Sequence, residues 1–201
     1  SLAFIRSRIE EGVFTQHVVV NAGKIVAMQS DEELRRSVLE ADMINADGMS
    51  VVWASRFLGK ALPARVAGID LMLELVKMSF EKSYKCYFLG AKQAVVEAVV
   101  AEFSGKYSPD IVAGYRNGYF SSDEEAKVAE DIAASGADML FVAMSSPKKE
   151  IFVNKYKDVM KVPFVMGVGG SFDVVAGVTK RAPLWMQRLG LEWFYRFIQE
   201  P

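Results

Sequence analysis

Short apolar runs alternate along this chain with longer amphipathic segments, and this alternation limits the folds open to it. The apolar runs predict strands at residues 17–21, 42–45, 85–91, 110–115, 137–144 and 162–170. The amphipathic segments predict helices at residues 22–41, 47–59, 68–83, 92–107, 122–136 and 146–160. Nearly continuous apolar strands are typical of a parallel sheet covered on both faces. The sequence therefore predicts an α/β, Rossmann-like fold with a mainly parallel sheet and a C-terminal helical tail.

Local signals predict where several helices begin. Ser30 and Glu33 form a capping-box pattern, which predicts a break in the 22–41 segment near Ser30–Asp31. The 47–59 helix is expected to start at the carboxylate of Asp47. For the 146–160 helix we expect Ser146 at the N-cap and Pro147 at the first helical position.

Composition narrows the functional classes. A chain of 201 residues predicts one domain spanning 1–201, and its net charge of −1 gives no reason to expect nucleic-acid binding. No apolar stretch is long enough for a membrane span, and no signal peptide is visible, which indicates a cytosolic protein. The single cysteine, Cys86, lies in an apolar run and is expected to be a buried, inert thiol. One histidine, His17, leaves no histidine-based metal cluster.

Ligands of open parallel sheets bind beyond the carboxyl ends of the strands. That rule selects five places in this sequence: Asn21, Asp47, Gly90–Ala91, Ser145–Lys149 and Gly167–Asp173. The last of these, in "GVGGSFD", has Gly167, Gly169 and Gly170 followed by Ser171, which is expected to begin a helical turn. The loop is either a phosphate cradle or a plain strand-to-helix turn. It lacks the spacing of a dinucleotide fingerprint and the G-K-[ST] of a P-loop, which disfavours a nicotinamide cofactor and leaves a nucleoside diphosphate open.

Four charged residues each have a functional and a structural interpretation. Asp47 is either a helix cap or a general base for a substrate hydroxyl. Lys148 and Lys149 lie in a first helical turn, where cations are disfavoured unless an anion binds there; otherwise they form a solvated surface. Arg65 either clamps an acidic group or makes a surface ion pair.

The sequence contains no D-x-D and no cluster with metal-ligand spacing. We therefore expect neither a metal site nor a cofactor. If a diphosphate is the leaving group, backbone N–H groups and basic side chains must meet its charge.

The tail from Lys180 to Pro201 combines aromatic, aliphatic and basic residues. It predicts either helices that pack on the sheet edge or a surface that meets a membrane or another subunit. Its amphipathic residues are Trp185, Met186, Leu189, Leu191, Trp193, Phe194, Phe197 and Ile198, with Arg188 and Arg196 between them.

Several blocks, in this order, resemble the WecG/TagA/CpsF glycosyltransferase family (glycosyltransferase family 26). They are "VNA" (20–22), "ADGMSVVWASRFLG" (46–59), "LPARVAGIDLM" (62–72), "YFLGAK" (87–92), "NGYFS" (117–121), "SPKKE" (146–150), "GVGGSFDVVAG" (167–177) and the tail at 180–201. The resemblance covers nearly the whole chain. It implies an inverting, metal-independent transfer of a hexose, first of all N-acetylmannosamine, from a UDP-sugar to a polyprenol-diphosphate-linked sugar in bacterial cell-surface polysaccharide synthesis.

The resemblance also implies roles for individual residues. Asp47 matches the family's proposed catalytic base, Asn21 an asparagine in the same pocket, and Arg65 the arginine of the R-V-A-G block. The nucleotide-sugar side of the cleft is matched by Gly90, Tyr119, Pro147, Glu150 and the Gly167–Asp173 loop, including Gly169, Gly170 and Ser171. The protein is then expected on the cytoplasmic face of the bacterial membrane, held there by its C-terminal region, and a homo-oligomer fits the same picture.

Three features depart from the family pattern. Val19 stands where many members have threonine, and Lys149 stands where the common P-K-Q-E pattern has glutamine. The second change introduces a charge and is expected to alter donor preference. Members usually also continue with an arginine-rich appendage beyond the position of Pro201, and the chain opens at Ser1 within a helix-like segment; we expect a sequence trimmed at both ends.

Two other interpretations stay open within this resemblance. One is a UDP-glucose-dependent member, and the other is a non-catalytic UDP-sugar-binding subunit that regulates or scaffolds polysaccharide assembly. A Rossmann-type oxidoreductase is disfavoured because the dinucleotide fingerprint is missing.

Overall fold

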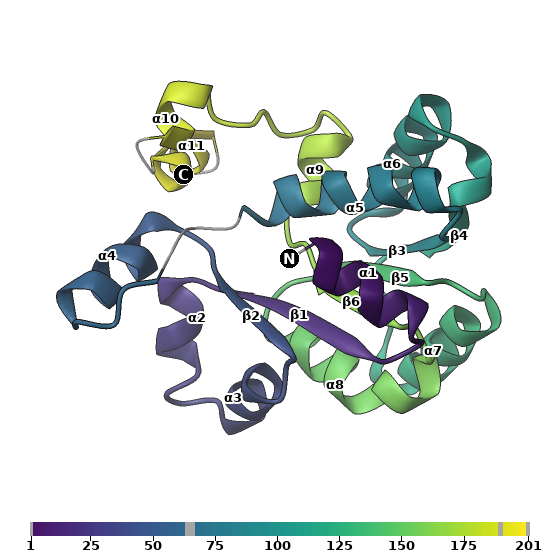
Figure 1. Cartoon of the computed structure of the whole chain (residues 1–201), viewed down its shortest axis with the longest axis horizontal. Coiled ribbons are helices and arrows are strands. Elements are labelled where there is room, and N and C mark those ends of the chain that lie inside the picture. The colour runs from purple at the N-terminus through teal and green to yellow at the C-terminus, as the bar shows by residue number, and fades with distance from the viewer. Residues whose placement is uncertain (1, 63–66, 189–190, 200–201) are drawn as a thin grey trace.

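The computed structural model describes residues 2–62, 67–188 and 191–199. Within them, one sheet has the strand order β2-β1-β6-β5-β3-β4, and all neighbouring strands are parallel. Figure 1 shows this sheet passing between two sets of helices. The strands are β1 Thr15–Val20, β2 Met43–Ala46, β3 Cys86–Gly90, β4 Val112–Arg116, β5 Met139–Ala143 and β6 Phe164–Gly167.

Helices connect the strands and cover both faces. They are α1 Leu2–Glu10, α2 Ala22–Ala27, α3 Glu32–Leu39, α4 Met49–Phe57, α5 Gly68–Lys82, α6 Gln93–Lys106, α7 Glu125–Ala134, α8 Lys148–Met160, α9 Ser171–Val175, α10 Leu184–Arg188 and α11 Glu192–Gln199, with 3₁₀ turns η1 Pro109–Ile111 and η2 Ser122–Glu124. The predicted α/β, Rossmann-like fold is confirmed.

Alternate residues of the strands β3, β5 and β6 supply the two main cores, as a parallel sheet covered on both sides requires. On one face Phe88 stacks against Phe103 of α6 and Phe141 of β5, with ring centroids 5.6 and 5.7 Å apart, and α1, α5 and α9 close this core. On the other face Leu89 and Val142 pack with residues of α7 and α8. Cys86 is fully buried, and burial raises the pKa of its thiol to about 12, as expected for an inert cysteine.

The break predicted near Ser30–Asp31 is confirmed, since α2 ends at Ala27 and α3 begins at Glu32, but the predicted Ser30 capping box and the predicted start of α4 were wrong. The capping carboxylate of α3 belongs to Asp31, which accepts from the Leu34 amide at 2.9 Å, while the Ser30 hydroxyl donates to the carbonyl of Ala27. The α4 helix begins at Met49 instead of Asp47. The Asp47 amide still donates to the Val20 carbonyl of β1 at 2.9 Å, and Gly48 then turns the chain at φ 96°.

The start of α8 also differs from the prediction. Its N-cap position is Pro147, which follows a cis Ser146–Pro147 peptide bond, and Ser146 provides no side-chain cap. The Lys149 amide donates to the carbonyl of Ser145 instead. The predicted 110–115 strand begins only at Val112, because Ser108 caps a 3₁₀ turn before it.

The direction of the chain across the sheet changes between β1 and β6. From β1 the chain moves outward to its neighbour β2, whereas it reaches β6 from β5 on the other side. Loops that leave neighbouring strands in different directions open a crevice at the carboxyl edge. The fold therefore predicts a ligand site where β1, β2 and β6 end.

Candidate active site

A cleft of about 790 Å³ opens beyond the ends of β1, β2 and β6. Its wall brings together segments from most of the chain, because the carboxyl ends of parallel strands meet at one edge. The residues of this wall include Asn21, Lys24, Asp47, Gly48, Ser146, Pro147, Lys149, Gly167, Gly169, Gly170, Ser171, Thr179, Lys180, Arg181, Glu192 and Tyr195.

Asp47 is half-buried in this wall, directly after β2. Its amide bond to Val20 continues the pairing of β1 with β2, so its backbone is fixed by the sheet. A carboxylate on a fixed backbone at the ligand edge can accept a proton from a bound hydroxyl. The residue predicted to act as a general base therefore lies in the wall of the cleft.

Asn21 follows β1 on the neighbouring strand. Its side-chain oxygen accepts from the Lys24 amide at 2.9 Å and so caps α2, and the residue lines the cleft as predicted. The cap orients the first turn of α2 and with it the side chain of Lys24.

Lys24, Lys149 and Glu150 form a buried charge cluster beside the cleft. Oε1 of Glu150 lies 2.6 Å from Nζ of Lys24 and 2.8 Å from Nζ of Lys149, and Glu150 is only 2% exposed. Nζ of Lys24 also donates to the Val19 carbonyl at 2.7 Å. Glu150 thus lies behind the wall as the partner of two lysines that line it.

The pKa values within this cluster follow from burial and charge. Burial lowers the pKa of Lys149, with Lys24 adding repulsion and Glu150 opposing both. For Glu150, burial acts to raise the pKa, but the two ammonium groups outweigh it and lower the pKa overall. The carboxylate is therefore held ionised.

The glycine-rich loop forms the opposite wall. Gly169 has φ 52°, which favours glycine, and the Ser171 hydroxyl donates to the Val168 carbonyl at 2.7 Å. Gly167 leaves room for Lys149: a Cβ there would meet Cε of Lys149 at 3.0 Å. Asp173, the last residue of the predicted loop, lies in α9 outside the cleft wall, and its backbone carbonyl accepts from the amides of Val178 and Thr179.

Other predicted residues lie at the same sheet edge but outside the cleft wall, around the turn after β4. Gly90 has φ 127°, and a Cβ there would come within 2.4 Å of the Ala143 carbonyl oxygen. A glycine is therefore needed here so that β3 and β5 can pack together. Lys148 turns away from the cleft: its Nζ donates to the Phe120 carbonyl at 2.9 Å and lies 4.3 Å from the Phe120 ring centroid.

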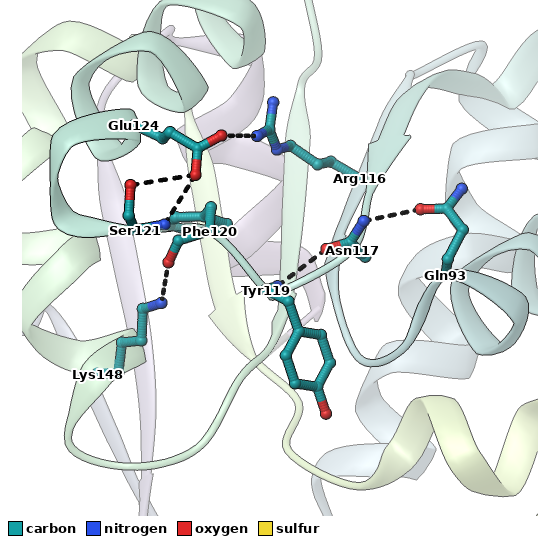
Figure 2. Close-up of polar contacts among 8 residues, drawn as sticks. All are labelled: Gln93, Arg116, Asn117, Tyr119, Phe120, Ser121, Glu124 and Lys148. Atoms are coloured by element: carbon teal, nitrogen blue, oxygen red, sulfur yellow. Dashed lines mark hydrogen bonds and ion pairs between the residues drawn. The ribbon is translucent and has the colours of Figure 1, made fainter.

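Figure 2 shows how this turn presents Tyr119. The side-chain nitrogen of Asn117, Nδ2, donates to Oε1 of Gln93 at 2.9 Å. The side-chain oxygen of Asn117, Oδ1, accepts from the backbone amide of Tyr119, also at 2.9 Å. The Tyr119 ring points away from these bonds and is 72% exposed. Arg65 lies outside the described residues.

Sequence reasoning missed Lys24 and Arg181. Lys24 meets Glu150 across 126 positions, and no local pattern signals such a pair. Arg181 forms a two-pronged ion pair with Asp70, at 2.5 and 2.8 Å, and so attaches the tail segment to α5. Its position after the glycine-rich loop was the one available signal.

Part of the tail lines the cleft. Figure 1 shows α10 and α11 away from the sheet, on the same side of the molecule as α4, and Glu192 and Tyr195 of α11 line the cleft. Packing on the sheet edge, one of the two predicted interpretations, does not describe this arrangement. Exposed apolar side chains accompany it at Leu184, Trp185, Phe194 and Ile198. Within the described residues, no helix combines the length and apolar character that crossing a membrane requires.

The sheet and its cleft define an α/β protein with a large cleft at a topological switch point and an aspartate in the wall of that cleft. The chain belongs to the glycosyl transferase WecG/TagA/CpsF family, whose family model matches residues 1–201. The predicted family is thereby confirmed.

Curated relatives carry a more specific name. An N-acetylglucosaminyldiphosphoundecaprenol N-acetyl-beta-D-mannosaminyltransferase of Bacillus subtilis (strain 168) is 38% identical over 182 residues, which cover 90% of this chain and 70% of the relative. A protein of the same name from Bacillus spizizenii is 39% identical over 161 residues, covering 80% of this chain and 62% of the relative. The matches thus span about two thirds of each relative's length.

Proposed function

We propose that this protein transfers N-acetylmannosamine from a UDP-sugar to an N-acetylglucosamine carried on a polyprenol diphosphate. Family membership and the names of the two relatives support this transfer. The observation that carries it is the place of Asp47, half-buried in the wall of a large cleft that the loop after β6 also lines.

The proposed reaction is a single displacement with inversion and without a metal. Asp47 takes the proton from a hydroxyl of the acceptor sugar, and that oxygen forms a bond to the anomeric carbon of the donor. The bond from this carbon to the diphosphate breaks on the opposite face, and UDP leaves with the electron pair. Asp47 then releases its proton to solvent.

Backbone groups of the glycine-rich loop and the basic side chains near it are proposed to face the diphosphate. Gly169 and Gly170 line the cleft without side chains, so a ligand can approach their backbone closely. Lys180 and Arg181 lie in the same wall. Backbone N–H groups and cations of this kind are what a metal-independent mechanism needs to meet the charge of the leaving diphosphate, which supports the proposal.

The exposed ring of Tyr119 is proposed to stack on the uracil. A ring that is 72% exposed, on a turn held by Asn117 and Gln93, offers a preformed apolar face. Its place at the same sheet edge as the cleft fits a nucleotide that extends from the diphosphate toward β4.

The acceptor lipid requires a membrane surface near the cleft. We propose that the protein associates peripherally with the cytoplasmic face of the membrane through its C-terminal region. The exposed Leu184, Trp185, Phe194 and Ile198 lie on the two helices beside the cleft, and such side chains favour a lipid interface.

A donor screen tests this function. The protein in its natural full length is incubated with a short-chain lipid-diphosphate-N-acetylglucosamine and, in turn, with the UDP-linked forms of N-acetylmannosamine, glucose, N-acetylglucosamine and N-acetylmannosaminuronic acid. Mass spectrometry should show the disaccharide lipid with the N-acetylmannosamine donor. Turnover with UDP-glucose alone would replace the donor assignment, and binding without transfer to any acceptor would contradict an enzymatic role.

A further inference from the structure

Beneath the cleft, the buried cluster of Lys24, Glu150 and Lys149 does not balance its own charge. Two ammonium groups share one carboxylate, and both ammonium groups bond the same oxygen, Oε1. One positive charge therefore remains among the three residues. Burying such a charge costs free energy unless a group of opposite charge pairs with it.

Both lysines of this cluster reach the cleft. Each lines its wall, and Gly167 leaves the space in which the Lys149 chain runs. Glu150 lies behind them and holds both ammonium groups in place, so an incoming group meets cations whose positions are already fixed. Preorganised cations bind an anion with little loss of side-chain entropy.

A second observation lies on the far side of Glu150. Its other oxygen, Oε2, is buried and has no hydrogen-bond partner among the described residues, and the same holds for Nδ1 of His17. Both residues line one small space of about 10 Å³, which is close to the volume that a single water needs. The amide nitrogen of Asn45 lies 2.8 Å from Nε2 of His17, so Nε2 accepts and the proton of the neutral ring is on Nδ1.

We propose that Lys24, Glu150 and Lys149 form a preassembled oxyanion subsite in the cleft, with His17 positioning Glu150 from behind through one buried water. The subsite accepts a phosphate or carboxylate oxygen of the ligand, and Lys149 supplies the main charge-assisted hydrogen bond. The proposal rests on the proposed function for the identity of the whole ligand. Its oxyanion has two sources, the diphosphate of the nucleotide or the carboxylate of a uronic acid donor.

Calorimetric titration of the full-length protein separates the two sources. Lys149→Gln and Lys24→Gln are compared with wild type, and Lys155→Gln is the matched control, because Lys155 is an exposed lysine on the same helix that pairs with Glu125 at the surface. The probes are inorganic pyrophosphate, uridine, UDP, UDP-glucose and UDP-glucuronic acid. Loss of one charge-assisted hydrogen bond weakens binding by about tenfold to a hundredfold.

The pattern across the probes decides the outcome. We expect both cleft variants to bind pyrophosphate and UDP about tenfold or more weakly, with uridine unchanged and Lys155→Gln like wild type. Weakening confined to UDP-glucuronic acid assigns the subsite to the sugar carboxylate. Unchanged affinity for every anion, or equal weakening of uridine, overturns the proposal. Wild-type binding of pyrophosphate without any binding of UDP would contradict the proposed function alone.

Binding measurements on two variants test the positioning role of His17. His17→Gln should leave uridine affinity unchanged and weaken UDP severalfold, while His17→Asn, whose amide lies closer to its own backbone, should weaken it more. Equal UDP affinity in wild type and both variants would remove His17 from the subsite.

Discussion

Nζ of Lys24 lies 2.6 Å from Oε1 of Glu150, although 126 positions separate the two residues in the chain. This contact joins the first turn of α2 to the first turn of α8 under the floor of the cleft. Because Lys149 bonds the same oxygen, removing the carboxylate would leave two buried ammonium groups facing each other.

Glu150→Leu should therefore destabilise the fold strongly. Breaking a buried ion pair by removing one partner typically costs about 3–5 kcal/mol. Urea unfolding followed by circular dichroism measures this change in the free energy of unfolding. A loss below about 1 kcal/mol would mean that the cluster is not buried in solution.

Stability should also depend on pH through His17. Burial, and then the charge of Lys24, lower the pKa of His17 to about 4 in the fold, whereas an unfolded histidine titrates near 6.5. As pH falls, His17 is protonated in the unfolded chain before it is protonated in the fold. The stability that the neutral, buried His17 contributes is therefore complete above pH 6.5 and is lost as pH falls toward 4. Between pH 7 and 4 it amounts to about 3 kcal/mol.

The variant His17→Gln removes this effect and leaves every other titratable residue of the sequence in place. Unfolding midpoints measured at several pH values should fall less steeply for His17→Gln than for wild type below pH 6.5. Parallel curves would show that His17 is not a buried neutral histidine.

Gly167→Ala should weaken UDP binding with little effect on folding. The added Cβ would meet Cε and Cδ of Lys149 at 3.0 and 3.2 Å and would displace that side chain. Gly105→Ala is the control, since a Cβ on this exposed helical position meets nothing within 4 Å and should stabilise α6 by about 0.5–1 kcal/mol. Unchanged UDP affinity in Gly167→Ala would show that the position of Lys149 does not matter for binding.

Tyr119→Ala should raise the KM for the nucleotide sugar without lowering the unfolding temperature. The ring is largely exposed, and base–aromatic stacking contributes about 1–3 kcal/mol per base. Tyr119→Phe keeps the stacking face and should retain the wild-type KM. If both variants behave like wild type, the uracil lies elsewhere.

Much of this architecture could be predicted from the sequence, because it depends on local patterns. The apolar runs around Phe88, Phe141 and Val165 are near-continuous, so the parallel sheet and the meeting of its carboxyl ends followed directly. Asp47 and Gly167 were predicted at the ligand edge for the same reason, and both line the cleft.

What could not be predicted depends on contacts between distant residues. Nothing near Lys24 indicates that Glu150 will neutralise it, and nothing near Gly90 indicates that the Ala143 carbonyl occupies the space of a side chain. Lys148 and Lys149 are adjacent in sequence, yet the helix directs one toward Phe120 and the other into the cleft. The prediction of a helix cap was wrong where two neighbouring residues could both cap the same helix, as with Ser30 and Asp31 before α3.

The central claim is that Asp47 acts as the base for glycosyl transfer, and Asp47→Asn tests it most directly. The substitution keeps the size of the side chain, and removing a general base typically lowers the rate about 10²–10⁴-fold. Turnover of UDP-N-acetylmannosamine with the lipid acceptor is measured by chromatography of the disaccharide product, with Asp158→Asn, an exposed carboxylate on α8, as control. The account predicts a kcat at least about a hundredfold lower for Asp47→Asn, with UDP affinity and the control unchanged; a kcat close to wild type would contradict it.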